Sequence, residues 1–184
     1  MSKITAISGR VLYNSRGSKT IEVDVVSDEK FVGRVCAPSG ASVGKFEAVS
    51  FPNNSPEESL SILNQNSDKF IGIDASDLKQ VHDVIHSIDE TENYAKIGGA
   101  CAFAITIAAT ESAAKAENKQ FFQMISDKSD LKFPFPLGNI LGGGAHAGPG
   151  TPDIQEILVA SIGAKTVRES IDMNLQVHKE LKKL

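Results

Sequence analysis

The sequence predicts an α+β fold, in which a three-stranded antiparallel meander is followed by helices and then by a shorter strand–loop–strand–helix segment. Residues 4–37 contain three runs of β character separated by tight turns, and residues 55–116 contain three helical patterns. The composition becomes polar at residues 126–132, which places a domain boundary near residue 130. We therefore expect one domain over residues 1–130 and part of a second over residues 131–184.

The meander is predicted from alternation and turns. Residues 4–13 form the first strand, and the turn at residues 14–17 leads into residues 19–26, where apolar side chains alternate with acidic ones. A second turn precedes residues 31–37, and Pro38 ends the third strand. Three short strands joined in this way favour an antiparallel sheet with one covered face. The side chains expected on that face are Ile21, Val23, Val25, Phe31, Gly33, Val35 and Ala37.

The helices are predicted from caps and from apolar periodicity. Residues 55–58 read SPEE, a cap followed by proline and two glutamates, and this helix extends to about Asn64. Asp77 begins a second helix, and residues 97–116 are apolar almost all round, which is typical of a helix buried in a core. Residues 121–125 form a short amphipathic turn or helix. The second helix is expected to bury Leu78, Val81, Ile85 and Ile88.

Two motifs allow more than one interpretation. Residues 39–45 read SGASVGK, a near miss for a phosphate-binding P-loop, because Ser39 replaces the first glycine and Phe46 follows the lysine. An ordinary surface loop, or a flexible lid that contributes a hydroxyl to a ligand, fits these residues better. Residues 82–86 read HDVIH, which is similar to a zinc-binding HExxH, but a solvated pair of histidines is favoured.

Composition restricts the partners and the compartment. The net charge of −4 argues against nucleic acid or an anionic membrane as the main partner. Cys36 and Cys101 lie in apolar contexts and are expected to be buried free thiols in a reducing cytosol. The N-terminal residues lack an apolar signal segment, and no apolar run reaches membrane-spanning length. We expect a cytoplasmic protein.

The richest stretch for chemistry is residues 133–157. Pro134 and Pro136 favour extended backbone, and a triple glycine, His146 and the pair Gln155–Glu156 follow at close spacing. The pattern indicates a strand, a ligand loop and a second strand over residues 154–162. The alternatives are a tight connection at the glycines, a capped loop residue at His146 and a strand-end surface residue at Glu156. Residues 166–169 form a capping box whose helix extends towards Leu184.

Widely separated motifs match one family, in the family's order. Residues 14–20 read NSRGSKT and resemble a DSRGNPT segment, and residues 39–44 read SGASVG and resemble SGASTG. Residues 89–100 follow a D-x-T-x-N…LGAN pattern, with Ala100 in place of the usual asparagine. Asn139-Ile140, the GGAHA of residues 143–147, Gln155-Glu156 and Gly163-Ala164 complete the series. Together they resemble enolase, the phosphopyruvate hydratase of glycolysis, over the whole chain.

The resemblance implies an N-terminal α+β domain followed by the start of an α/β (TIM-like) barrel, of which residues 131–184 supply two strands and one helix. It implies Mg²⁺-dependent, reversible dehydration of 2-phosphoglycerate to phosphoenolpyruvate. Glu156 would be the catalytic residue, supporting the acid that expels hydroxide, and Ser42 would ligate a magnesium ion. The residues implied in substrate binding are Gly40, Ala41, His146, Gln155 and Glu156. Enolases commonly form homo-oligomers, either dimers or octamers.

The matched motifs do not include the family's catalytic lysine, its acid or its three main metal-binding carboxylates. We therefore expect this chain to be part of a longer enolase and to be inactive alone. An alternative is a non-catalytic interaction module that docks on a partner through the exposed edge of the half-barrel, where unpaired parallel strands would need a cover. A phosphate-binding module that uses the two glycine-rich loops is a third possibility.

Overall fold

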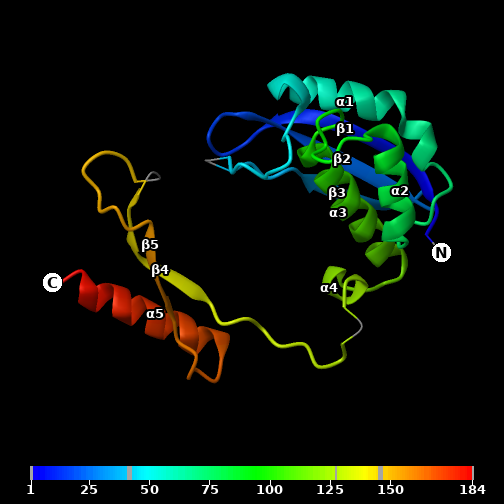
Figure 1. Cartoon of the computed structure of the whole chain (residues 1–184). Helices are drawn as coiled ribbons and strands as arrows, with labels where there is room; N and C mark the ends of the chain where they lie inside the picture. The colour runs from blue at the N-terminus through cyan, green and yellow to red at the C-terminus, as the bar shows by residue number, and fades with distance from the viewer. Residues whose placement is uncertain (1, 41–42, 127, 145–146, 184) are drawn as a thin grey trace. The chain divides into compact units, whose positions relative to one another are not determined.

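The computed structural model describes residues 2–40, 43–126, 128–144 and 147–183. The chain divides into two compact units, residues 1–127 and residues 128–184 (Figure 1). The fold class expected from the sequence, an α+β unit followed by the beginning of a barrel, is confirmed.

The first unit contains the predicted meander. Strands β1 (Ile4–Tyr13), β2 (Lys19–Ser27) and β3 (Phe31–Cys36) pair antiparallel in the order β1-β2-β3. The register places Val11 opposite Ile21 and Val25 opposite Gly33. Because side chains alternate along a strand, this register gathers the apolar positions on one face. The fully buried apolar side chains of β2 are Ile21, Val23 and Val25.

The helices of this unit begin at the predicted caps. Helix α1 (Pro56–Gln65) is capped by Ser55, whose Oγ accepts the N–H of Glu58 at 3.2 Å. Helix α2 (Leu78–Ile88) is capped by Asp77, whose Oδ1 accepts the N–H of Gln80 at 3.1 Å. Helix α3 (Gly99–Ala116) and the four-residue helix α4 (Phe121–Met124) follow, and short 3₁₀ helices lie at Pro52–Asn54 and Ser67–Phe70. Among the described helices, none is long and apolar enough to cross a membrane.

Helix α3 packs against the sheet at Gly33. A Cβ at this position would lie 1.9 Å from the carbonyl oxygen of Ala108 and 2.6 Å from the nitrogen of Ser112. Only glycine permits such a close approach of strand and helix backbones. The helix contributes Cys101, Ala104 and other small residues to a core that also contains side chains from β1, β2, α1 and α2, with Val35 of β3 packed against it. The apolar run of residues 97–116 is therefore the central helix of this unit, as predicted.

Asp89 organises the segment that leads into α3. Its buried carboxylate accepts the N–H and hydroxyl of Thr91 at 3.0 and 2.5 Å, and the N–H groups of Lys96 and Ile97 at 2.8 and 2.7 Å. Burial, the largest single influence, opposes ionisation, but these hydrogen bonds together outweigh it and lower the pKa of Asp89. The D-x-T motif is thus a folding element that fixes the loop before α3.

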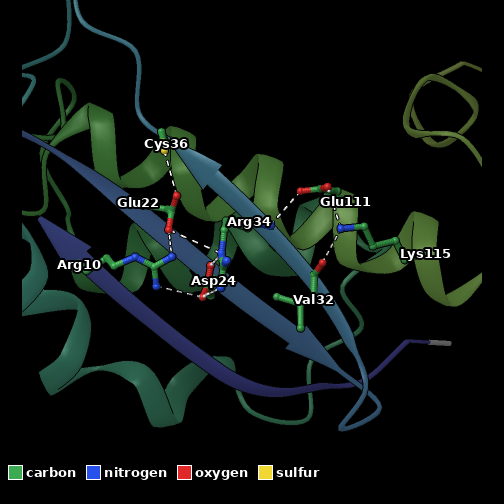
Figure 2. A network of polar contacts seen from close by, with 8 residues as sticks. All are labelled: Arg10, Glu22, Asp24, Val32, Arg34, Cys36, Glu111 and Lys115. Atoms are coloured by element: carbon green, nitrogen blue, oxygen red, sulfur yellow. Dashed lines mark hydrogen bonds and ion pairs between the residues drawn. The ribbon is translucent and has the colours of Figure 1, made fainter. Parts of the chain in front are cut away.

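The other face of the sheet carries a network of charged side chains (Figure 2). Arg34 donates to both carboxylate oxygens of Asp24, at 2.7 and 2.8 Å, and this contact lowers the pKa of Asp24. Arg10 pairs with Glu22 and lies 3.5 Å from Asp24. The thiol of Cys36 donates to Glu22 at 3.1 Å. Cys36 is therefore exposed on this face, and the prediction that it is buried is wrong; Cys101 is buried as expected.

The second unit is a hairpin with a helix. Strands β4 (Leu137–Gly142) and β5 (Glu156–Ala160) pair antiparallel, so the expectation of parallel strands is wrong. Strand β5 is also shorter than the predicted residues 154–162: it begins at Glu156, because the carbonyls of Gln155 and Pro152 accept hydrogen bonds from Gly143 and Gly144, and it ends at Ala160. The two strands are joined by a loop, which allows the antiparallel pairing; a parallel pair would need a crossover connection.

Helix α5 (Val167–Leu181) follows β5. Thr166 Oγ1 accepts the N–H of Glu169 at 3.1 Å, while the Glu169 carboxylate accepts the N–H of Lys165 at 2.7 Å, one residue before the usual capping-box partner. Asn174 attaches the helix to the hairpin: its Oδ1 accepts from Ser161 at 2.7 Å and its Nδ2 donates to the Pro136 carbonyl at 2.8 Å. These bonds satisfy a buried amide.

Candidate functional site

The start of the loop after β3 is held by the turn after β1. Arg16 donates to the backbone carbonyls of Ser39 and Gly40, at 3.1 and 3.4 Å, and Asn14 Nδ2 donates to Ser39 Oγ at 2.8 Å. The Asn14 carboxamide oxygen also accepts the N–H groups of Arg16 and Ser18, at 2.9 and 3.0 Å. Asparagine at this position therefore builds the turn as an aspartate would, and adds a donor towards Ser39.

The chain after the loop is fixed by the segment that Asp89 organises. Val49 donates its N–H to Asn93 at 2.9 Å and accepts from Gly99 at 2.7 Å, and Ala100 donates to the Ser50 carbonyl at 3.2 Å. The loop leads into a turn and coil, and the next helical residues are the 3₁₀ turn at Pro52–Asn54. A P-loop requires a helix directly after its lysine, so this context contradicts that interpretation. Of the predicted site residues here, Gly40 is exposed, and Ala41 and Ser42 lie outside the described residues.

In the second unit, the triple glycine lies against the residues that precede β5. Gly143 donates its N–H to the Gln155 carbonyl at 2.8 Å, and Gly144 donates to the Pro152 carbonyl at 2.7 Å. A Cβ on Gly143 would lie 2.4 Å from the Ile154 oxygen and 2.5 Å from the Pro152 oxygen. Gly144 has a φ of +63°, a conformation that suits glycine. The glycines are thus required for a tight connection, which brings them beside Gln155.

This connection places the predicted carboxylate at the mouth of the hairpin loop. Glu156 is the first residue of β5 and pairs with Gly142, the last residue of β4. Gln155 and Glu156 are both exposed. The structure therefore brings Gln155 and Glu156 together with the triple glycine, while His146 lies outside the described residues. An exposed carboxylate and carboxamide beside a glycine turn can accept from and donate to a polar ligand.

Two further residues contribute to the candidate site. Asn14 and Arg16 were recognised in the sequence only as part of a turn and a motif, yet they hold Ser39 and Gly40. The available signal was an arginine inside a tight turn, since a long cationic side chain there can reach the carbonyls of a neighbouring loop.

The histidine pair has a different environment from a metal site. His82 and His86 are exposed on α2; His82 Nε2 lies 3.3 Å from Thr106 Oγ1, and His86 stacks on Tyr94 with ring centroids 5.6 Å apart. A hollow of about 610 Å³ lies beside them and is lined by His82, Tyr94 and Thr106 among others. In the described part of the chain, no group of three or more histidine, cysteine or acidic residues could hold a metal ion.

Comparisons with known proteins agree with the motifs. Residues 4–125 match the model of the enolase N-terminal domain, and residues 130–184 match the model of the enolase C-terminal TIM barrel domain. The chain is 38% identical to the enolase of Methanosphaera stadtmanae over 182 residues, which is 98% of this chain and 44% of that protein. It is 39% identical to the enolase of Methanothermobacter thermautotrophicus over 184 residues, which is 100% of this chain and 44% of that protein.

The enolase of Archaeoglobus fulgidus is 38% identical over 175 residues, 95% of this chain and 43% of that protein. The chain thus spans less than half the length of these relatives. The family models cover both units, and the architecture is that of an enolase N-terminal domain followed by the start of its barrel. This chain belongs to the enolase family.

Proposed function

We propose that this chain forms part of a magnesium-dependent enolase that interconverts 2-phosphoglycerate and phosphoenolpyruvate by reversible loss of water. One observation supports this most directly: in a chain of this family, the hairpin of the second unit presents Gln155 and Glu156, both exposed, beside a glycine turn. Elimination of water from such a substrate requires control of a proton, a leaving hydroxide and two anionic groups.

The proposed roles follow from the side chains. Glu156 is the catalytic carboxylate and supports the acid that protonates the leaving hydroxide. Gln155 and His146 contact the substrate through hydrogen bonds, and the loop residues Gly40 and Ala41 approach it through their backbone. The contacts of Asn14 and Arg16 with Ser39 and Gly40 favour a defined starting position for this loop.

The donor chemistry fits magnesium in part. The Ser42 hydroxyl and the carboxylate groups offered by this chain are oxygen ligands, which Mg²⁺ prefers. Magnesium supplies positive charge that offsets the anionic groups of the substrate. Since the described residues contain no group of three possible metal ligands, the proposed site needs carboxylates from a longer chain. Ser42 is the residue of this chain that we assign to metal binding.

We further propose that the 184-residue chain has no dehydratase activity alone, and that the active protein is longer, cytoplasmic and homo-oligomeric. The sheet face with two arginines and two carboxylates supports the last point, because such a surface can be self-complementary across a two-fold axis. The apolar side chains exposed on the second unit also fit an incomplete barrel. They include Leu137, Leu141, Leu158, Ile171 and Leu175.

The same exposed surface is the observation that favours the second candidate, a non-catalytic module that docks on a partner through its half-barrel edge. The mass of the native gene product, measured together with a magnesium-dependent assay for phosphoenolpyruvate, separates the two. We expect a mass more than twice 19.6 kDa with activity that is lost in Glu156→Gln. A native product of 19.6 kDa without activity favours the docking module. Turnover by the purified 184-residue chain contradicts the proposed inactivity.

A further inference from the structure

Strand β3 forms an edge of the three-stranded sheet in the described part of the chain. In an antiparallel strand the N–H and C=O of one residue point to the same side, and successive residues alternate. Ala37 donates its N–H to Ile21 on β2 at 2.9 Å, so Val32 and Arg34 direct their backbone groups away from β2. An exposed edge of this kind is a template for another strand.

Helix α3 occupies part of this edge with two side chains (Figure 2). Lys115 Nζ donates to the Val32 carbonyl at 2.6 Å, and Glu111 Oε2 accepts the N–H of Arg34 at 2.8 Å. Glu111 and Lys115 are one helical turn apart and form an ion pair of 2.9 Å with each other. The close approach of the α3 backbone to Gly33 brings both side chains within reach of the strand.

Each of these two side chains offers the hydrogen-bonding group that its backbone partner on the edge of β3 requires. The ammonium group meets a carbonyl oxygen, and the carboxylate meets an N–H, which are the acceptor and donor that an incoming strand would use. Hydrogen bonds to charged groups are stronger than those between neutral backbone groups. An incoming strand would therefore replace two charged bonds by two ordinary ladder bonds, and would also have to separate the ion pair.

We propose that the Glu111–Lys115 pair closes the free edge of β3 against strand addition by a second copy of this chain. An exposed ion pair contributes little to folding stability. The position of this pair at the sheet edge therefore explains its presence better than a contribution to the free energy of unfolding does. The role concerns association and is independent of the enolase reaction proposed above.

The test compares the full chain with the double variant Glu111→Ala/Lys115→Ala by analytical ultracentrifugation. A matched control is Lys79→Ala/Asp83→Ala, which removes an exposed ion pair of the same i, i+4 type on α2, a pair joined at 2.6 Å. We expect the edge variant to self-associate at least about tenfold more tightly than the original chain, since two ladder bonds become available. The control is expected to associate no more than the original chain, whose own association sets the baseline.

Adding Val32→Pro to the edge variant shows whether association uses β3. The N–H of Val32 points away from β2, so proline removes an edge donor without breaking the ladder. We expect this third substitution to return association to the baseline. Equal association of the edge variant and the original chain overturns the proposal, as does association that persists with Val32→Pro. Circular dichroism verifies folding, and the single variant Lys115→Ala replaces the double variant if that variant unfolds.

Discussion

The guanidinium of Arg16 donates a hydrogen bond to the backbone carbonyl of Ser39, with 3.1 Å between Nη2 and the oxygen. The contact joins the turn after β1 to the start of the loop after β3, two segments that each match a motif of the family. The proposed substrate residues Gly40 and Ala41 follow directly. The turn therefore positions the loop, and this relationship can be tested without an assay for turnover.

Replacing Arg16 by glutamine should loosen the start of the loop while leaving the fold intact. The variant loses the two donors that reach the Ser39 and Gly40 carbonyls. We expect lower backbone order parameters at these two residues, measured by ¹⁵N relaxation, and a change in unfolding free energy below about 1 kcal/mol because the contact is exposed. Arg168→Gln on α5 is the control. Unchanged order parameters at both residues would show that Arg16 does not restrain the loop.

Replacing Asp89 by asparagine should destabilise the first unit strongly. An asparagine side chain cannot accept from all four donors, because its amide nitrogen would face either the two donors of Thr91 or the N–H groups of Lys96 and Ile97. Hydrogen bonds to a buried charge are worth about 1.5–3 kcal/mol each, so we expect a loss of about 3 kcal/mol in urea unfolding. The control is Asp68→Asn at an exposed position, with a change below about 0.5 kcal/mol. Equal stability of both variants would contradict the role of Asp89.

Acid should destabilise the first unit through three carboxylates. The pKa values of Asp24, Asp74 and Asp89 are all lowered in the folded chain, that of Asp24 mainly by Arg34 and those of Asp74 and Asp89 by hydrogen bonds that outweigh burial. A lowered folded pKa gives stability that is complete above the unfolded pKa, about 3.9, and is lost as the pH falls through the folded value. We expect the urea concentration at the unfolding midpoint to decrease once the pH is below about 4. The decrease should be less steep in the variant Asp89→Asn. A midpoint that is constant from pH 5 to pH 3 would refute this expectation.

Replacing Gly33 by alanine should separate α3 from the sheet. The added methyl group would meet backbone atoms of Ala108 and Ser112, which cannot move as a side chain could. Overpacking of this kind costs about 1–3 kcal/mol, and we expect the upper end of that range in urea unfolding. At Gly163 a Cβ would meet nothing within 4 Å, so Gly163→Ala serves as the control. A similar small effect of both substitutions would mean that α3 does not depend on close contact at Gly33.

The two thiols should differ in reactivity. Burial raises the pKa of the Cys101 thiol to about 12. Cys36 is an exposed residue, but partial burial of its sulfur atom and the hydrogen bond to Glu22 also raise its pKa. Because the thiolate is the reactive form, we expect a disulfide reagent to label Cys36 first, more slowly than free cysteine, and Cys101 only after denaturation. The variant Cys36→Ser should show almost no native labelling. Rapid native labelling of that variant would contradict the buried position of Cys101.

Local patterns in the sequence were sufficient for most of the elements. Alternation at Ile21, Val23 and Val25 predicted the central strand, and Ser55, Asp77 and Thr166 marked the three capped helices, because capping and periodicity depend on neighbours in the chain. The triple glycine and Gln155 were assigned to one ligand loop because both lie in one short stretch, but the hydrogen bond between Gly143 and Gln155 was not predicted.

Features that depend on contacts between distant residues could not be predicted in this way. The exposure of Cys36 depends on its face of the sheet and on Glu22, fourteen residues away. The start of β5 at Glu156 depends on hydrogen bonds from Gly143 and Gly144, and the hydrogen bond from Arg16 to Ser39 joins residues 23 positions apart. A periodic pattern carries no information on such pairs.

The shift of register within the hairpin has a consequence for insertions and deletions. Asn139 pairs with Leu158 and Leu141 pairs with Ile157, so β4 uses two steps where β5 uses one. Deleting Ile140 would remove the extra residue of β4 and make the ladder regular, while Leu141 would still pair with Ile157 and Gly142 with Glu156. Strand β5 has no such spare residue, so deleting Leu158 would shift the register and turn part of the strand over. In a deletion scan of this segment, loss of Ile140 should therefore be less harmful than loss of Leu158.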